Sequence, residues 1–190
     1  MTRSDSSGQS FKKALLIQSH VVHGYVGNKA ATFPLQYRGW DIDALNSVQY
    51  SNHPGYGFFS GFQAPHKELA SIVSDGLIDA MEIEYDVILT GYIPHGDMLR
   101  EMGRLVGGLV GKHPDKTKWI LDPVLGDNGR LYVETSTVQV VKDILRNPDN
   151  QISLTTPNQF EMELLTDIKI TDLTSLKLSF QEFHRIYPTI

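Results

Sequence analysis

The sequence contains no cysteine, which excludes disulfides and thiolate metal sites. It has no cluster of Lys or Arg, and its formal net charge is −5, so neither nucleic acid nor an anionic membrane surface is an expected partner. No apolar run approaches the roughly 20 residues that a membrane-spanning helix needs. The polar start, residues 1–11, lacks the apolar core of a signal peptide and is predicted to be a disordered tail. These absences favour a cytoplasmic location.

What the sequence does contain is an alternation of short apolar runs and helical patterns. Its 190 residues are 41% hydrophobic and 21% charged, which is ordinary for one globular domain with a real core. We therefore predict an α/β fold in which a mostly parallel sheet is covered by helices. The predicted strands are 14–17, 41–48, 86–92, 119–121 and 151–154, and the predicted helices are 28–36, 66–81, 97–112, 135–145 and 174–187.

Two of the predicted helices carry features that the structure must explain. The 66–81 segment places apolar residues at helical spacing, which predicts a stripe facing the core. The 97–112 segment contains four glycines at positions 103, 107, 108 and 111. Because each interior glycine costs about 1 kcal/mol against alanine, this helix must depend on packing.

Carboxylates follow the strand at 119–121. Asp122 stands where Pro123 must end the strand, and Asp127 lies just beyond it. In open α/β sheets, ligands bind at the carboxyl ends of the strands. The alternative is that Asp122 caps a turn and Asp127 is simply solvated.

A second strand end also delivers polar groups. The strand at 151–154 leads into Thr156, Asn158 and Glu161, where a helix begins. Asn158 or Thr156 could cap this helix, and the helix dipole favours Glu161 in its first turn. Capping is a sufficient explanation for each residue alone, but two neighbouring strand ends with carboxylates could together hold a hydrated Mg²⁺.

These stretches resemble a known family. Asp-Pro-Val-Leu-Gly-Asp at 122–127 and Thr-Pro-Asn-Gln-Phe-Glu at 156–161 resemble the motifs of pyridoxal kinases in the ribokinase-like superfamily. The block at 17–36 is similar to their N-terminus almost residue for residue. The resemblance implies a three-layer α/β/α fold with a small flap, and ATP-dependent phosphorylation of the 5′-hydroxymethyl group of pyridoxal, pyridoxine or pyridoxamine.

The resemblance also implies roles for particular residues. It places the vitamin against six residues, among which Ser19 would hydrogen-bond the pyridine ring: Ser19, Val48, Tyr50, His53, Pro54 and Tyr92. From the residues alone, Ser19 could equally be a loop hydroxyl bonding its own backbone. The nucleotide would lie against Asp122, Tyr132, Thr156, Asn158, Gln159, Phe160 and Glu161. Mg²⁺ would be held by Asp122, Asp127, Thr156 and Glu161. A monovalent cation, K⁺ or Na⁺, and a homodimer are also implied.

The chain departs from the family pattern in three places. Pro54 stands where the family often has Thr, and the 128–132 loop is short, which weakens the expectation for Tyr132. Neither Gly96-Asp97 nor Gly126-Asp127 is preceded by Gly-Thr, so the family's catalytic Gly-Thr-Gly-Asp motif is absent and no catalytic residue is assigned. We therefore interpret 12–190 as a kinase domain without its C-terminal part, inactive by itself.

Two other functions stay open at this point. The chain could be a non-catalytic vitamin-binding or dimerising module, because half of the expected nucleotide site is missing. It could also be part of a kinase for another small alcohol, such as a hydroxymethylpyrimidine, on the same fold.

Overall fold

The computed structural model describes residues 11–190, so nearly all of the predicted disordered tail, residues 1–10, lies outside the described residues. The chain divides into two compact units, one ending at Gly91 and the other beginning at Tyr92.

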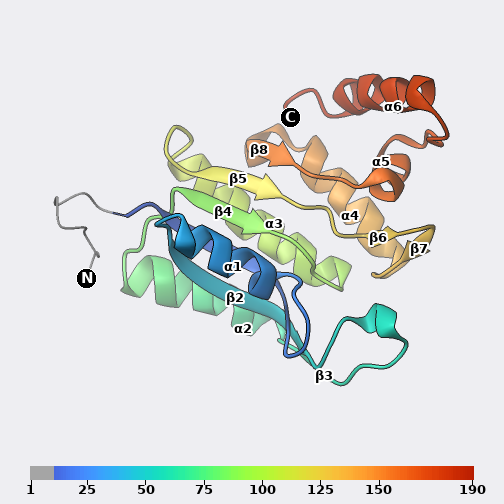
Figure 1. The fold of residues 1–190 in the computed structure, drawn as a ribbon. Helices are drawn as coiled ribbons and strands as arrows, with labels where there is room; N and C mark the ends of the chain where they lie inside the picture. The colour runs from blue at the N-terminus through green and yellow to red at the C-terminus, as the bar shows by residue number, and fades with distance from the viewer. Residues whose placement is uncertain (1–10) are drawn as a thin grey trace. The chain divides into compact units, whose positions relative to one another are not determined.

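The first unit is a small, mostly parallel sheet with strands in the order β3-β2-β1-β4 (Figure 1). β1 pairs in parallel with β2 and with β4, and β3 adds to the outer side of β2 in the antiparallel sense. The elements of this unit are β1 (Lys13–Val21), α1 (Asn28–Tyr37), β2 (Asp41–Tyr50), η1 (Pro54–Tyr56), β3 (Gly61–Gln63), α2 (His66–Ser71), η2 (Ile72–Ala80) and β4 (Val87–Thr90).

The connections place helices on both faces of this sheet. The chain passes from β1 through α1 to β2 on one side, and from β2 through α2 to β4 on the other side of β1. Since parallel crossovers are right-handed, opposite directions of travel put α1 and α2 on opposite faces. β1 is consequently covered from both sides, and its residues Leu15, Leu16 and Ile17 are each 0% exposed.

β1 extends further than the sequence predicts. Its pairing with β2 continues past Ile17 through Gln18 and, after a register shift, to Val21. The polar side chains of Gln18, Ser19 and His20 therefore do not end the strand, because its backbone still has a partner. Ser19 lies inside the last third of β1 rather than beyond it.

The 66–81 segment is helical, but its apolar stripe does not all face the core. The α-helical part is α2, and the chain then widens into the π-helical η2. Leu69 and Val73 are buried as expected, whereas Ile72 is 47% exposed and Met81 is 64% exposed. The prediction of one continuous core-facing stripe is wrong because hydrogen bonds to the fifth residue turn these side chains away from ordinary helical spacing.

The second unit pairs β5 with β8 in parallel and also contains a short β6–β7 hairpin. Its elements are α3 (Gly96–Lys112), β5 (Lys118–Leu121), β6 (Gly126–Asp127), β7 (Arg130–Leu131), α4 (Thr135–Arg146), η3 (Pro148–Asn150), β8 (Ile152–Thr155), α5 (Gln159–Thr166) and α6 (Leu173–Ile186). Trp119 of β5 and Tyr187 after α6 are almost completely buried. The hairpin turns at Asn128-Gly129, both with positive φ, which is the geometry this residue pair favours.

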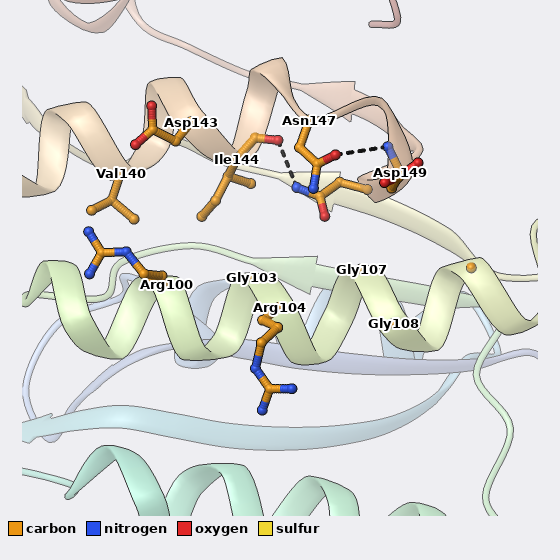
Figure 2. Close-up of a pocket in the computed structure, with 12 residues that line it drawn as sticks. Arg100, Gly103, Arg104, Gly107, Gly108, Val140, Asp143, Ile144, Asn147 and Asp149 are labelled. Carbon is orange, nitrogen blue, oxygen red and sulfur yellow. Dashed lines mark hydrogen bonds between the residues drawn. The ribbon is translucent and has the colours of Figure 1, made fainter.

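Two glycines of α3 allow this helix, which has a low intrinsic helix propensity, to pack closely against its neighbours. A Cβ at Gly103 would come 2.7 Å from Ile144, and one at Gly107 would come 2.3 Å from Asn150 Oδ1, so both positions let α4 and η3 approach closely. Gly108, by contrast, has nothing within 4 Å of its Cβ position. A groove of about 510 Å³ remains beside α3 and α4. Figure 2 shows residues that line it. No residue of the predicted vitamin or nucleotide sites lines it.

Among residues 11–190, no helix combines the length and the apolar character needed to cross a membrane.

Candidate functional site

Asp122 and Thr156 meet where β5 and β8 end. β5 ends at Leu121 and its parallel partner β8 ends at Thr155, so the next residues of the two strands are neighbours. The side chain of Thr156 hydrogen-bonds the Asp122 carboxylate. Burial raises the pKa of Asp122, and the bond from Thr156 only partly opposes this shift. Burial therefore disfavours the negative charge of Asp122, and a cation bound beside this carboxylate would stabilise that charge.

Glu161 and Asn158 form a reciprocal cap at the start of α5. Glu161 N–H donates to Asn158 Oδ1 at 3.0 Å, and Asn158 N–H donates to Glu161 Oε2 at 2.8 Å. This is the capping box that the Asn-x-x-Glu spacing permits. Of the two predicted capping candidates, Asn158 is the cap.

The same pair also holds the turn that follows β5. Glu161 Oε1 accepts from Leu125 N–H at 2.9 Å and from Gly126 N–H at 3.5 Å, while Asn158 Nδ2 donates to Gly126 O at 2.8 Å. Burial raises the pKa of Glu161, these backbone bonds lower it, and the nearby charge of Asp122 raises it slightly further. Glu161 is only 3% exposed, so its first role is to brace the backbone at 125–126.

The three carboxylates of the predicted metal set, Asp122, Asp127 and Glu161, do not gather into one cluster. Within residues 11–190 no three His, Asp or Glu side chains gather closely enough to hold a metal. Asp127 is exposed, and its carboxylate accepts from the backbone and side chain of Asn128 at 2.7 and 3.0 Å. Asp122 beside Thr156 still fits Mg²⁺, because this cation needs only one or two carboxylates when water and phosphates complete its shell.

The other residues predicted to bind the nucleotide differ in their burial and in the hydrogen bonds they already make. Phe160 is half-buried in the first turn of α5. Gln159 donates to Glu163 at 3.2 Å and to Ile170 O at 2.9 Å, so its amide serves the connection between α5 and α6. Tyr132 is 41% exposed, and its N–H donates to Leu125 O at 2.8 Å.

In the first unit, Ser19 lies against the turn before α1. A Cβ at Gly27 would come 2.4 Å from Ser19 Oγ and 2.1 Å from Ser19 O, and the φ of Gly27 is +54°. Both facts require glycine at position 27. The glycine thus allows the chain to return directly over the Ser19 hydroxyl, which is half-buried.

Val48 and Tyr50, predicted to contact the vitamin, are core residues of β2. They are 1% and 5% exposed. The Tyr50 hydroxyl accepts from Gln63 Nε2 at 3.0 Å, and its ring contacts that of Phe59 at 4.6 Å between centroids. The predicted strand ended at residue 48, whereas β2 runs to Tyr50 because β3 pairs with its end. These two residues can shape a pocket wall, but they expose little surface to a ligand.

His53 and Pro54 form the tip of an exposed loop, and Tyr92 lies in the second unit. Pro54 opens the short helix η1, and the N–H of Gly55 donates to His53 Nδ1 at 3.0 Å. The hydroxyl of Tyr92 donates to Tyr132 O at 3.3 Å. Pro54 occupies the first position of this turn, where its fixed φ suits a helix start.

Asn28, the first residue of the helix predicted at 28–36, has a structural role that the sequence did not reveal. Asn28 is 2% exposed, and its Nδ2 donates to Leu45 O at 2.9 Å and to Asn46 Oδ1 at 2.8 Å. It ties the first residue of α1 to β2 next to the Ser19 segment. The helix cap is Gly27, which has no side chain to bond the helix start. The amide of Asn28 instead bonds β2.

The sequence is similar to those of known pyridoxal kinases. No family model matches the sequence. A protein of Saccharomyces cerevisiae named "Putative pyridoxal kinase" is 56% identical over 179 residues, which are 94% of this chain and 56% of that protein. The pyridoxal kinase of Arabidopsis thaliana is 42% identical over 158 residues, covering 83% of this chain and 50% of that enzyme.

A solved structure agrees. The pyridoxal kinase of Leishmania donovani, in complex with ADP and pyridoxamine, superposes with a TM-score of 0.83 at 37% identity, covering 92% of this chain and 59% of that one. This likeness confirms the predicted fold class, a three-layer α/β fold with a mostly parallel sheet. By fold, the chain is of the ribokinase-like type.

By sequence and fold together, it is homologous to the pyridoxal kinases over 94% of its length. It spans about half the length of the curated relatives it matches.

Proposed function

We propose that this chain forms the vitamin-binding part and a portion of the nucleotide-binding part of a pyridoxal kinase. Such an enzyme transfers the γ-phosphoryl group of ATP to the 5′-hydroxymethyl group of pyridoxal, pyridoxine or pyridoxamine. The observation that carries the proposal is the frame of Asp122, Thr156, Asn158 and Glu161 at two adjacent strand ends, in a chain homologous to pyridoxal kinases.

On the vitamin side, we assign the pyridine ring to the Ser19 hydroxyl. A hydroxyl can donate to or accept from a heteroaromatic edge, and Gly27 keeps the backbone over it free of a side chain. Val48 and Tyr50 would form the wall behind the ring, and His53 with Pro54 would cover it. Tyr92 is the sixth residue that the resemblance to pyridoxal kinases assigns to the vitamin.

On the nucleotide side, we assign the phosphates to the turn after β5 and the start of α5. Helix N-termini favour anions, and Glu161 and Asn158 hold this turn in one conformation. Asp122 and Thr156 would hold Mg²⁺ largely through water, and a bound Mg²⁺ would neutralise charge on the phosphates. Tyr132 and Phe160 are the residues proposed to lie along the nucleotide.

The reaction needs positioning and charge neutralisation more than covalent chemistry. The 5′-hydroxymethyl oxygen forms a bond to the γ-phosphorus, the bond from that phosphorus to the β–γ bridging oxygen breaks, and ADP leaves. The hydroxyl proton must pass to a base, for which no residue of this chain is proposed. Asp127 is a poor candidate because its carboxylate already accepts two bonds from Asn128.

The remaining features of the proposal are its partners and setting. We include a monovalent cation, K⁺ or Na⁺, a homodimer and a cytoplasmic location, all carried over from the resemblance and the lack of cysteine. A non-catalytic vitamin-binding module is the second candidate, because the Asp127 carboxylate already accepts two bonds from Asn128 and is poorly placed to act as a base.

The test is a direct assay with a matched pair of variants. The intact mass of the native protein first establishes whether this sequence belongs to a longer chain. That native protein is then incubated with Mg²⁺-ATP and each vitamer, and pyridoxal phosphate or its analogue is measured together with ADP. The 190-residue chain is expected to show no turnover, because general-base catalysis alone contributes about 10²–10⁴-fold.

Two substitutions separate the two halves of the proposed site. Ser19→Ala should raise KM for the vitamin about 2–10-fold, the value of one hydrogen bond, with little change for ATP. Asp122→Asn should impair the use of Mg²⁺-ATP with little change in vitamin binding. A longer native protein that binds vitamin but forms no ADP would instead favour the binding module.

A further inference from the structure

The tip of the β6–β7 hairpin (Figure 1) carries Asn128 followed by Gly129, which is the single Asn-Gly pair of the sequence. All four residues at 127–130 are exposed. β6 and β7 have only two residues each. A hairpin this short opens locally at little cost, because few backbone bonds hold it. Solvent therefore reaches the Asn-Gly pair, and its backbone can change conformation.

The backbone nitrogen of Gly129 is an unhindered neighbour of the Asn128 amide. Within residues 11–190, no hydrogen bond engages the Gly129 N–H. A Cβ built at this glycine would meet nothing within 4 Å, so neither its own side chain nor a neighbouring group shields the nitrogen. Glycine also permits the wide range of backbone rotation that brings its nitrogen to the Asn128 side chain.

We propose that Asn128 is a site of spontaneous deamidation, in which the Gly129 nitrogen attacks the side-chain amide. A base from the solvent removes the Gly129 N–H proton, and the nitrogen forms a bond to Cγ of Asn128. The Cγ–Nδ2 bond breaks, and Nδ2 takes up a proton from water and leaves as ammonia. Water then opens the resulting succinimide ring. Aspartate forms when the bond from nitrogen to Cγ breaks, and isoaspartate when the bond from nitrogen to the main-chain carbonyl carbon breaks.

The carboxylate of Asp127 restrains this reaction. Its Oδ1 accepts from Asn128 N–H at 2.7 Å, and its Oδ2 accepts from Asn128 Nδ2 at 3.0 Å. Both bonds hold the amide on the Asp127 side of the turn. Cyclisation must break the second bond, because Nδ2 is the leaving group. Removing the carboxylate should therefore speed the reaction about 2–10-fold, the value of one hydrogen bond.

Deamidation reverses the interaction between residues 127 and 128. The amide NH₂ that donates to Asp127 is replaced by a carboxylate oxygen, which can only accept. Two negative charges then lie side by side where a hydrogen bond was. In isoaspartate the main chain also runs through the side-chain carbons, so the pairing of Asp127 with Arg130 that closes the turn no longer fits. The hairpin should loosen in both products.

For nucleotide use, the consequence rests on the proposed function. Gly126, the first residue of β6, is bonded through its N–H to Glu161 and through its carbonyl to Asn158. Tyr132, directly after β7, donates from its N–H to Leu125 O at 2.8 Å. The hairpin thus continues from the turn to which the phosphates are assigned. A new negative charge and a looser hairpin there should weaken the use of Mg²⁺-ATP and leave vitamin binding unchanged.

The first experiment follows the chemistry without any ligand. The native protein is kept in warm, mildly alkaline buffer, and its peptides are mapped by mass spectrometry at intervals. The peptide with Asn128 should gain the mass of an amide-to-acid conversion, and chromatography should separate its aspartate and isoaspartate forms. An Asn128 that stays intact overturns the proposal. Aspartate without isoaspartate also overturns it, because only the ring intermediate gives both.

Other asparagines of the chain are internal controls. Asn46, which precedes Ser47, lies within β2 and accepts from Asn28 Nδ2 at 2.8 Å, so its backbone and amide are both held. Asn147 precedes Pro148, whose nitrogen has no hydrogen to lose. Both should remain unmodified while Asn128 is converted. Equal conversion at Asn46 would contradict the role assigned to the exposed turn.

Three variants separate the attack from its restraint. In Gly129→Ala the methyl group hinders the attacking nitrogen, while the φ of +76° strains alanine and loosens the turn. A slower reaction in spite of a looser turn is expected, and an unchanged rate contradicts attack by this nitrogen. Asp127→Ala should react faster than wild type. Asp115→Ala, at another exposed carboxylate, is the control and should react at the wild-type rate.

The second experiment measures KM for Mg²⁺-ATP and for pyridoxal in the native protein. Asn128→Asp has the charge of the product, and Asn128→Gly is its uncharged partner, which accepts the positive φ of this position. KM for Mg²⁺-ATP should be about 2–5-fold higher in Asn128→Asp than in Asn128→Gly, the value of an exposed charge interaction. KM for pyridoxal should be equal in the two variants.

Aged wild type should approach Asn128→Asp as the converted fraction grows. Unchanged use of Mg²⁺-ATP after full conversion of Asn128 would overturn the consequence for the site. Complete lack of kinase activity in fresh protein would refute the proposed function, whereas the mass measurements would still decide whether Asn128 is modified.

Discussion

Replacing Glu161 by alanine should destabilise the second unit even when no ligand is present. The substitution leaves the N–H groups of Leu125 and Asn158 without their acceptor, at bonds of 2.9 and 2.8 Å. A buried donor without a partner costs about 1–3 kcal/mol, and this penalty applies to Leu125 N–H, whereas Asn158 is exposed and water can replace its lost acceptor. The lower half of this range is expected, because the variant also no longer buries a charge.

Urea denaturation followed by the fluorescence of Trp119 measures this loss, since that ring is 1% exposed in β5 of the same unit. Glu161→Gln, which keeps one acceptor oxygen, should lose less than Glu161→Ala. Glu182→Ala, at an exposed carboxylate paired with Arg185, is the control and should change little. If Glu161→Ala unfolded at the same urea concentration as wild type, the bracing role would be wrong and Glu161 would be left with a ligand-binding role alone.

The other predictions concern charge and packing. Burial raises the pKa of Asp122, so the stability its protonated form contributes is present at about pH 4 and is lost as the pH rises through the raised value. Without Mg²⁺, Asp122→Asn should therefore gain in unfolding free energy relative to wild type from acid to neutral pH, and the opposite trend in urea titrations would contradict it. In α3, Gly108→Ala should stabilise by about 0.5–1 kcal/mol, whereas Gly107→Ala should destabilise by about 1–3 kcal/mol because its Cβ would displace Asn150. Equal effects of these neighbouring variants on the thermal midpoint would refute the close-packing explanation.

Much of the fold could be predicted because apolar runs and helical spacing report burial directly. The strand before Asp122 ends where Pro123 requires, and β5 is found at Lys118–Leu121. The ends of β1 and β2 were harder to predict. Gln18, Ser19 and Tyr50 look like loop residues in the sequence, but partner strands extend the pairing through them. Tertiary pairing overrides local polarity in such places.

The sequence indicated which strand ends carry polar side chains, but it did not reveal the hydrogen bonds that those side chains make. The strand ends did bring Thr156 to Asp122, as the parallel arrangement requires. The sequence could not reveal that Glu161 is occupied by backbone N–H groups, because those donors come from a turn more than thirty residues earlier in the chain. It also contained the Asn128-Gly129 signal for the hairpin that turns Asp127 toward Asn128, which the sequence analysis treated only as a short loop.

The bonds around Asn158 and Glu161 have a consequence for how this site can change. Each of the two side chains accepts a hydrogen bond from the backbone N–H of the other residue. Each also bonds the backbone of the turn at Leu125 and Gly126. Losing either one already frees much of what the second one holds, so the two losses should not add. In a double-mutant cycle, Asn158→Ala and Glu161→Ala together should cost clearly less than the sum of the single changes. A substitution at one position therefore removes most of the penalty for a substitution at the other, and the pair is expected to be replaced jointly or not at all.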